Sequence, residues 1–251
     1  MTTSFPALLA DRQRRDPARP LVTFYDDASG ERIELSLTTY ANWVSKTAGL
    51  LQDELELERG ALVLVDLPTH WLGPVWLGAA WTMGLCVTAD ADLVDEAALV
   101  VCGPEGVDRY AGHADRVPVV ALSLRPLGGR FTDPLPDGVT DYGAVVLAQP
   151  DVFAPLDPPD RQDPAWRAGR SVRTQDDLLL APDPTGLTAG DRLLTDLNPC
   201  TTEGLATLVA PLLLGAGTVW VAHPDESTWA HRRDAERAGV ELRAAGVVPE
   251  P

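Results

Sequence analysis

Two uncharged runs of 19 residues, 71–89 and 204–222, place the strongest limit on how this chain folds. A run of this length without charge approaches that of a membrane-spanning helix. Each run nevertheless contains a proline and several glycines, and each breaks at glycine (Gly84, or Gly215 and Gly217) before a β-branched stretch. We therefore predict, in both runs, a buried helix, a tight turn and a buried strand, and we predict no transmembrane segment.

The remaining apolar segments extend this pattern along the chain. We expect helices at residues 5–15, from Thr38 or Thr39 to about 54, and at 69–83, 202–214 and 228–238, and strands at 21–25, 32–36, 61–65, 85–88, 97–102, 117–122, 145–147, 192–197 and 218–221. Strand–helix–strand repetition of this kind is typical of doubly wound, mostly parallel sheets flanked by helices. The predicted fold class is therefore α/β.

The chain divides by composition into three parts. Residues 1–148 are expected to form a first α/β subdomain, and residues 176–251 a second, shortened one. Residues 149–175 are expected to form a connection between them. It is rich in proline and aspartate, which do not favour long helices or strands. We expect the two subdomains to pack as one compact unit.

The net charge and the cysteine content limit which partners the protein is expected to bind and in which cellular compartment it is expected to lie. The net charge of −17 repels phosphate backbones and anionic headgroups, so neither nucleic acid nor a membrane surface is an expected partner. Three cysteines without a C-x-x-C pair predict reduced thiols in the cytoplasm, and the N-terminus lacks the features of a signal peptide. Four scattered histidines have no metal-ligand spacing, so no metal site is expected.

An ordered set of short motifs resembles the AMP-forming acyl-adenylating synthetases, the superfamily of the acyl-CoA synthetases. The matching segments are Leu-Thr-Thr-Tyr-Ala at 37–41, Glu-Arg-Gly at 58–60, Leu-Pro-Thr at 67–69, Trp-Thr-Met-Gly at 81–84, Leu-Thr-Ala-Gly-Asp-Arg-Leu-Leu at 187–194, and the helix and glycine turn of 204–219. The chain also looks like a family of short actinobacterial proteins of this shape. The resemblance implies the fold of the N-terminal part of the synthetase large domain.

The resemblance also shows where the synthetase chemistry is missing. Synthetases activate a carboxylate with ATP and hold the phosphates in a Ser/Thr/Gly-rich loop ending in lysine, which would follow a strand at 144–147 here. The corresponding residues 148–158 contain no glycine and no hydroxyl side chain, and Asp151 and Asp157 would repel a phosphate. Losing several such contacts, each contributing on the order of 2–4 kcal/mol, would remove the transition-state stabilisation that adenylation needs.

Two further absences agree with this interpretation. The adenine and magnesium motifs of the family, and its C-terminal domain with a catalytic lysine, would lie beyond residue 251. The only lysine, Lys46, is expected on a helix in a solvated role. We therefore predict a truncated, degenerate relative with no catalytic residues and no cofactor; the sequence leans against an enzyme without deciding the matter.

Five residues after a predicted strand form the candidate ligand site: Asn198, Cys200, Thr201, Thr202 and Glu203. In α/β sheets, ligands bind in the crevice at this end of the strands. In the synthetases an aromatic–histidine pair stands here beside the acyl pocket, whereas this chain has cysteine and threonine. The helix start could bind a small anion, but capping by threonine is the expected role. Cys200 as a nucleophile would need a base, and His223 is the candidate nearest in sequence.

Three functions remain open. The first is a non-catalytic remnant that acts by protein interaction or self-association, as a homodimer or a stable hetero-complex, because a sheet edge or apolar face near residues 218–221 would need cover. The second is a sensor that binds an acyl or nucleotide-like small molecule without turnover. The third is an AMP-dependent ligase-like enzyme with an atypical site.

Overall fold

The computed structural model describes residues 4–181 and 185–244. The helices are α1 (Phe5–Arg15), α2 (Leu37–Gly49), α3 (Leu72–Thr82), α4 (Val107–Ala111), α5 (Tyr142–Val145), α6 (Gln175–Leu179), α7 (Ala206–Leu214) and α8 (Glu226–Glu236). The strands are β1 (Pro20–Asp26), β2 (Glu31–Ser36), β3 (Leu62–Asp66), β4 (Cys86–Thr88), β5 (Leu99–Cys102), β6 (Val119–Ala121), β7 (Val139–Asp141), β8 (Pro164–Ala168), β9 (Ser171–Thr174), β10 (Arg192–Thr195), β11 (Gly217–Ala222) and β12 (Val240–Leu242).

These strands form two sheets. One has the order β12-β10-β11-β1-β2 and the other the order β7-β6-β5-β3-β4-β8-β9. Pairing is parallel throughout except at one end of each sheet, where β1–β2 and β8–β9 are antiparallel hairpins. The α/β class with mostly parallel sheets flanked by helices is thereby confirmed.

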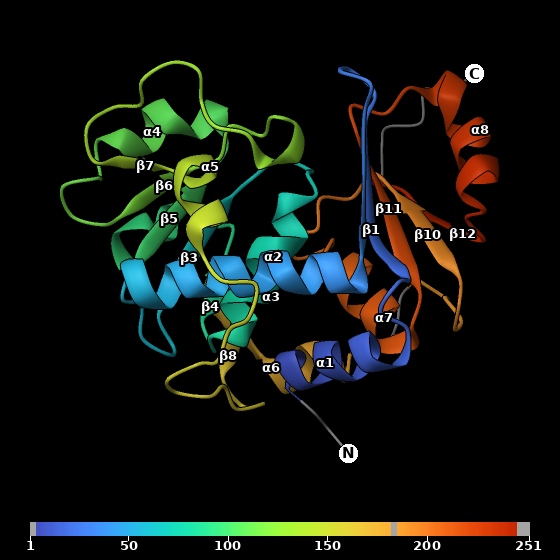
Figure 1. The fold of residues 1–251 in the computed structure, drawn as a ribbon, viewed down its shortest axis with the longest axis horizontal. Helices are drawn as coiled ribbons and strands as arrows, with labels where there is room; N and C mark the ends of the chain where they lie inside the picture. Colours follow the sequence, from blue (N-terminus) through green and yellow to red (C-terminus); the bar gives the residue numbers. More distant parts are fainter. Residues whose placement is uncertain (1–3, 182–184, 245–251) are drawn as a thin grey trace.

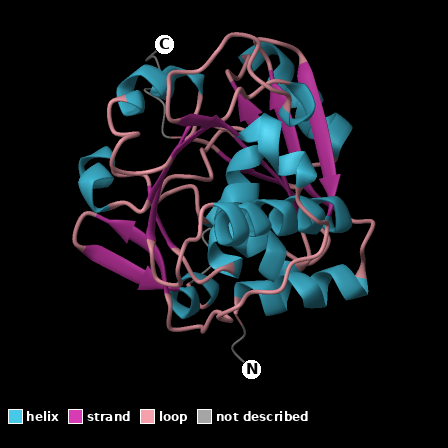
Figure 2. Cartoon of the chain, turned by 60° about the vertical axis from the view of Figure 1, so that its left-hand side comes forward, coloured by secondary structure: helices cyan, strands magenta, loops and turns pink. Residues whose placement is uncertain are grey.

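The helices α2 and α3 lie between the two sheets (Figures 1 and 2). Every residue of α3 is buried, and one hydrophobic cluster joins Phe24 and Trp220 of the first sheet to Val63 and Val65 of the second. The first uncharged run therefore forms the core between the sheets, and the turn at Gly84 has a φ of +70°, which favours glycine. No helix in the described part of the chain is long and apolar enough to cross a membrane.

A close contact with glycine holds α2 against α3. The Tyr40 hydroxyl donates a hydrogen bond to the Pro74 carbonyl over 2.8 Å inside the core. A Cβ atom on Gly78 would stand 2.4 Å from that hydroxyl and 2.9 Å from a methyl of Val44. Only glycine therefore allows the two helices to approach this closely.

The second helix–turn–strand unit also forms as predicted, and it corrects one expectation. β11 lies between β10 and β1, and all of its residues are buried. The exposed sheet edge expected near residues 218–221 is therefore wrong, because β1 from the start of the chain covers that side.

Other expectations are corrected locally. The strand expected at 145–147 is wrong, since this segment continues from α5 into a 3₁₀ turn at Val146–Ala148. The helix expected to start at Thr38 or Thr39 is capped by Ser36, whose hydroxyl accepts from the Thr39 amide. β7, β9 and β12 were not expected, and β8 forms within the proline-rich connection. The division at 148 and 176 stays a prediction; each sheet takes strands from more than one of the three parts.

We expect Gly78→Ala to lower the free energy of unfolding by about 1–3 kcal/mol, because the added methyl overpacks the α2–α3 contact. The measurement is urea unfolding followed by circular dichroism. Gly112→Ala is the matched control: nothing lies within 4 Å of a Cβ there, and its φ of −66° suits alanine. Equal stability of the two variants would contradict the proposed constraint.

Candidate functional site

Asn198 links the carboxyl ends of strands from the two sheets. Its side-chain amide donates to the carbonyl of Leu67, directly after β3, over 2.7 Å. Its side-chain oxygen accepts from the Cys200 amide over 2.9 Å and holds the turn that follows β10. Both functional groups of Asn198 are thus used structurally, at the point where the sequence predicts a ligand crevice.

Cys200 is buried against α3. A Cβ on Gly73 would lie 2.9 Å from its Sγ atom, so the thiol fills the space that this glycine leaves. Burial raises the pKa of the Cys200 thiol to about 12, which keeps it protonated near neutral pH. His223 instead forms a 2.8 Å contact with Asp26 at the surface. The geometry therefore provides no activated nucleophile at Cys200.

Thr201 caps a turn rather than the helix. Its hydroxyl accepts from the Gly204 amide over 3.1 Å, and the amides of Gly204 and Leu205 also bond to its carbonyl. The amides of Thr207 and Leu208 bond to carbonyls of the same turn, and α7 begins at Ala206 instead of residue 202. Since these donors are engaged, the geometry favours the capping role over an anion site.

Thr202 and Glu203 lie at a pocket of about 380 Å³ between α6 and α7. The lining residues are Arg173, Leu178, Ala181, Thr202, Glu203, Leu205, Ala206, Val209, Ala210, Leu213 and Leu214. The indole of Trp166 in β8 donates to the Thr202 hydroxyl over 3.0 Å and fixes one end of the pocket. The structure thus divides the predicted set: Thr202 and Glu203 face the pocket, while Asn198, Cys200 and Thr201 shape the turn beside it.

The opposite wall of this pocket was not predicted from the sequence. Arg173 and Leu178 come from β9 and α6, a polar segment for which no element was predicted. One signal was present, because Thr174 and Asp177 form a capping box in which each side chain bonds the other's backbone amide. That spacing indicates a helix start at 175, although the pairing with α7 depends on the tertiary fold.

The loop at residues 148–158 is pinned along α2 and the π-helical turn that follows it, Leu50–Glu54. The Lys46 ammonium lies 3.0 Å from Asp151 and donates to the Gln149 carbonyl, and the Leu156 amide donates to Gln52 over 2.8 Å. Lys46 is therefore mostly buried and paired, and the expected solvated role is wrong. Because no strand precedes this loop, its position does not match the synthetase phosphate loop either.

The next parallel strand along the chain, β8, offers another place for such a loop. β8 pairs with β4, and only two residues separate it from its other partner β9, since Ala168 pairs with Ser171. The Gly169 carbonyl is already bonded by Arg167 over 3.0 Å. A turn of this length has too few backbone N–H groups to surround a triphosphate. Among the described residues, moreover, no group of three His, Cys, Asp or Glu side chains could hold a metal ion.

Solved structures with the same fold are acyl-CoA synthetases. The chain is similar to the Brucella canis acyl-CoA synthetase with a TM-score of 0.78 and 17% identity, covering 97% of this chain and 47% of that one. It is similar to the N-terminal domain of FACL13 from Mycobacterium tuberculosis with a TM-score of 0.72 and 15% identity, covering 94% and 62%. The chain thus spans about half to three-fifths of these proteins, and at such identities the likeness shows the fold alone.

A sequence relative covers nearly the whole chain. It is the "TIGR03089 family protein" of Mycobacterium tuberculosis (strain ATCC 25618 / H37Rv), 38% identical over 241 residues, which are 94% of this chain and 96% of the relative. A scan against family models found no match.

We expect the folded protein to resist alkylation by iodoacetamide at pH 8. All three cysteines are buried, and burial raises the pKa of Cys86 to about 11 and those of Cys102 and Cys200 to about 12, so roughly one thiol in a thousand or fewer is ionised. Mass spectrometry should show modification only after unfolding in guanidinium chloride. Rapid modification of Cys200 in the folded chain would instead restore it as a candidate nucleophile.

Proposed function

The chain belongs to the TIGR03089 family, and we propose that it binds an amphipathic carboxylate between α6 and α7 without adenylating it. The observation that carries this proposal is the pocket of about 380 Å³ bounded by Thr202 and Glu203. These residues directly follow the position where the resemblance places the acyl pocket of the synthetases. The proposed role is that of a sensor or carrier, in the cytoplasm, where buried free thiols remain reduced.

The absence of adenylation rests on the backbone around the two possible phosphate sites. The first, residues 148–158, is held against α2 by Lys46 and against the following π-helical turn by Gln52. The second is the two-residue turn between β8 and β9. Phosphoryl and adenylyl transfer depend on donors that are already aimed at the phosphates, and neither segment offers such a set.

The chemistry of the pocket walls indicates the ligand class. Val209 and Leu213 belong to the apolar face of α7, Leu205 directly precedes that helix, and Leu178 of α6 lies opposite. A volume near 400 Å³ lies within the range of about 300–1,000 Å³ that is usual for small-molecule sites. Arg173 can bind a carboxylate through its planar guanidinium, whereas Glu203 in the same lining would repel one, so the proposed ligand places its carboxylate at Arg173 and its apolar chain along α7.

A second candidate function is protein interaction, as a hetero-complex or a homodimer. It no longer rests on a sheet edge at 218–221, because β11 is covered on both sides. It is favoured instead by large apolar side chains that stand in solvent at Val152 and Leu156, on the segment pinned against α2.

We expect Mg·ATP to bind more weakly than about 100 µM, equivalent to about −5.5 kcal/mol. Calorimetric titration of the purified chain should give no saturable heat in this range, because no backbone cradle is available for the phosphates. A tighter, saturable response would reopen the ligase interpretation. Lys46→Ala then serves as a check, because a response that disappears in this variant would assign the lysine to the nucleotide.

We expect decanoic acid to bind in the α6–α7 pocket and Ala206→Phe to weaken this binding at least about tenfold. The larger side chain occupies volume that the apolar chain needs, and each buried methylene contributes about 0.8 kcal/mol. Titration calorimetry measures both affinities. Ala91→Phe is the matched control, since Ala91 is exposed in the 3₁₀ helix Ala91–Glu96, away from the pocket lining.

The orientation of the ligand is tested by Arg173→Gln. If the carboxylate binds at Arg173, this variant loses about tenfold in affinity for decanoic acid and little for decanol, which lacks the charge. Decanoic acid affinities unchanged in both Ala206→Phe and Arg173→Gln would place the ligand elsewhere and overturn the proposed site.

A further inference from the structure

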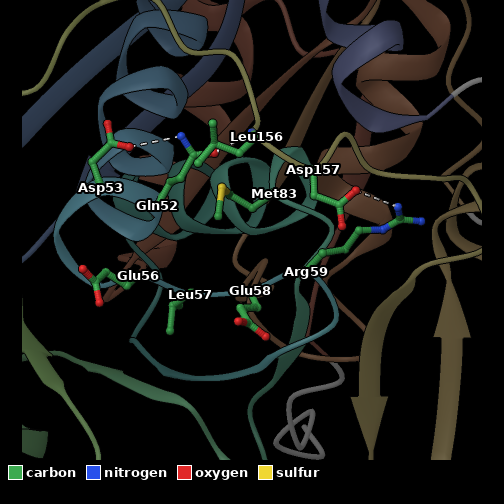
Figure 3. A pocket seen from close by; sticks show the side chains of 9 residues that line it. All are labelled: Gln52, Asp53, Glu56, Leu57, Glu58, Arg59, Met83, Leu156 and Asp157. Carbon is green, nitrogen blue, oxygen red and sulfur yellow. Dashed lines mark hydrogen bonds and ion pairs between the residues drawn. The ribbon is translucent and has the colours of Figure 1, made fainter.

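A second hollow lies on the opposite end of α3 from the Cys200 contact. This groove, of about 690 Å³, opens between the π-helical turn after α2, the segment leading to β3 and the connection near Leu156 (Figure 3). Three apolar side chains line it, Leu57, Met83 and Leu156, together with the carboxylates of Asp53, Glu56 and Glu58. We call it the Leu156 groove.

The connection that borders the groove carries exposed apolar side chains. Leu156, which lines the groove, is 86% exposed, and Val152, four residues earlier on the same connection, is 83% exposed. Single exposed apolar residues are common, but two on one connection, one of them lining a groove, are typical of an interaction surface.

Hydrogen bonds and ion pairs hold this segment outward. The Lys46–Asp151 ion pair fixes the segment on α2, and the bond from the Leu156 amide to Gln52 fixes it on the π-helical turn that follows. A further ion pair at 3.3 Å joins Asp157 to Arg59 across the groove. The surface is therefore formed before any partner arrives, which lowers the conformational entropy lost on binding.

The negative charge of the groove indicates which kind of partner it can bind. Arg59 is the one basic side chain that lines the groove. It already forms ion pairs with Asp157 and with Asp163, the latter at 2.7 Å. In the described part of the chain, no basic side chain forms an ion pair with Asp53, Glu56 or Glu58. Each copy of this chain carries a net charge of −17, so close approach of two copies is electrostatically unfavourable. The groove therefore complements a positively charged partner, and not itself.

We propose that the Leu156 groove is a docking site for a basic amphipathic segment of a partner protein, one large apolar side chain of which enters between Leu57, Met83 and Leu156. Lysine or arginine side chains flanking this anchor face the carboxylates of Asp53, Glu56 and Glu58. The groove shares no lining residue with the α6–α7 pocket, so this docking is independent of fatty-acid binding.

The test is selection from a random library of twelve-residue peptides displayed on phage, with the full chain as target at about 0.1 M salt. We expect enrichment of peptides with a net positive charge and at least one large apolar residue. Synthetic copies are then measured by fluorescence anisotropy against variants of the chain. No enrichment, or enrichment of acidic peptides, overturns the proposal.

Two matched pairs of variants locate the binding. Leu156→Ser should weaken the selected peptides about tenfold or more, whereas Leu127→Ser, at an equally solvent-facing leucine outside the groove, should leave affinity unchanged. Circular dichroism confirms that both variants fold, as expected for exposed positions. Equal losses in the two variants overturn the proposal.

The double variant Glu56→Gln/Glu58→Gln should weaken binding about threefold to tenfold at low salt and reduce its salt dependence. Glu105→Gln/Asp108→Asn removes the same charge from exposed positions around the start of α4 and should have little effect. Equal effects would assign the attraction to net charge alone and contradict a defined site. Light scattering completes the test, because a dimer that dissociates in Leu156→Ser would make a second copy the occupant and overturn the basic partner.

Discussion

The rest of the structure depends on the burial of α3 on all sides between the two sheets. A helix without a solvent-exposed face must pack closely against other elements on every side. Those elements approach it most closely at its glycines. The Tyr40 side chain of α2 packs directly against Gly78, and the Cys200 side chain, in the turn after β10, packs directly against Gly73. The same helix therefore sets the distance between the sheets and the conformation of the candidate site. Catalytic chemistry at Cys200 would conflict with this packing, because a thiol that fills a dry gap is protonated and inaccessible.

The buried runs were the part of the fold that the sequence made easiest to predict. A continuous apolar helix followed by glycine and a β-branched strand has few alternatives, so both helix–turn–strand units formed where they were expected. Short apolar segments are different, since residues 145–147 suit a strand and a helical turn equally well. Here the Asp141 side chain caps the Gly143 amide and starts a helix, which removes the expected strand.

Non-local pairing was the part that could not be predicted. β1 pairs with β11 almost two hundred residues later, and no local pattern indicates this contact. The same limit applies to the candidate site. Thr202 and Glu203 were found because they follow a strand, but Arg173 and Leu178 reach the pocket only through the fold. The Leu156 groove was missed because its acidic residues, within 53–58, look like ordinary solvated surface, and Leu156 reaches them only through the fold.

The fold and the adenylation chemistry make different demands on the chain, so one can persist without the other. The contacts that hold the sheets together are apolar or use backbone within the core, and none of them requires a phosphate-binding loop. A glycine-rich loop loses much conformational entropy on folding, whereas a two-residue hairpin turn loses little. The two-residue turn after β8 therefore suits the stability of the fold and offers few donors to a nucleotide. If the chain does not adenylate, as we propose, the same architecture still presents the α6–α7 pocket and the Leu156 groove for binding.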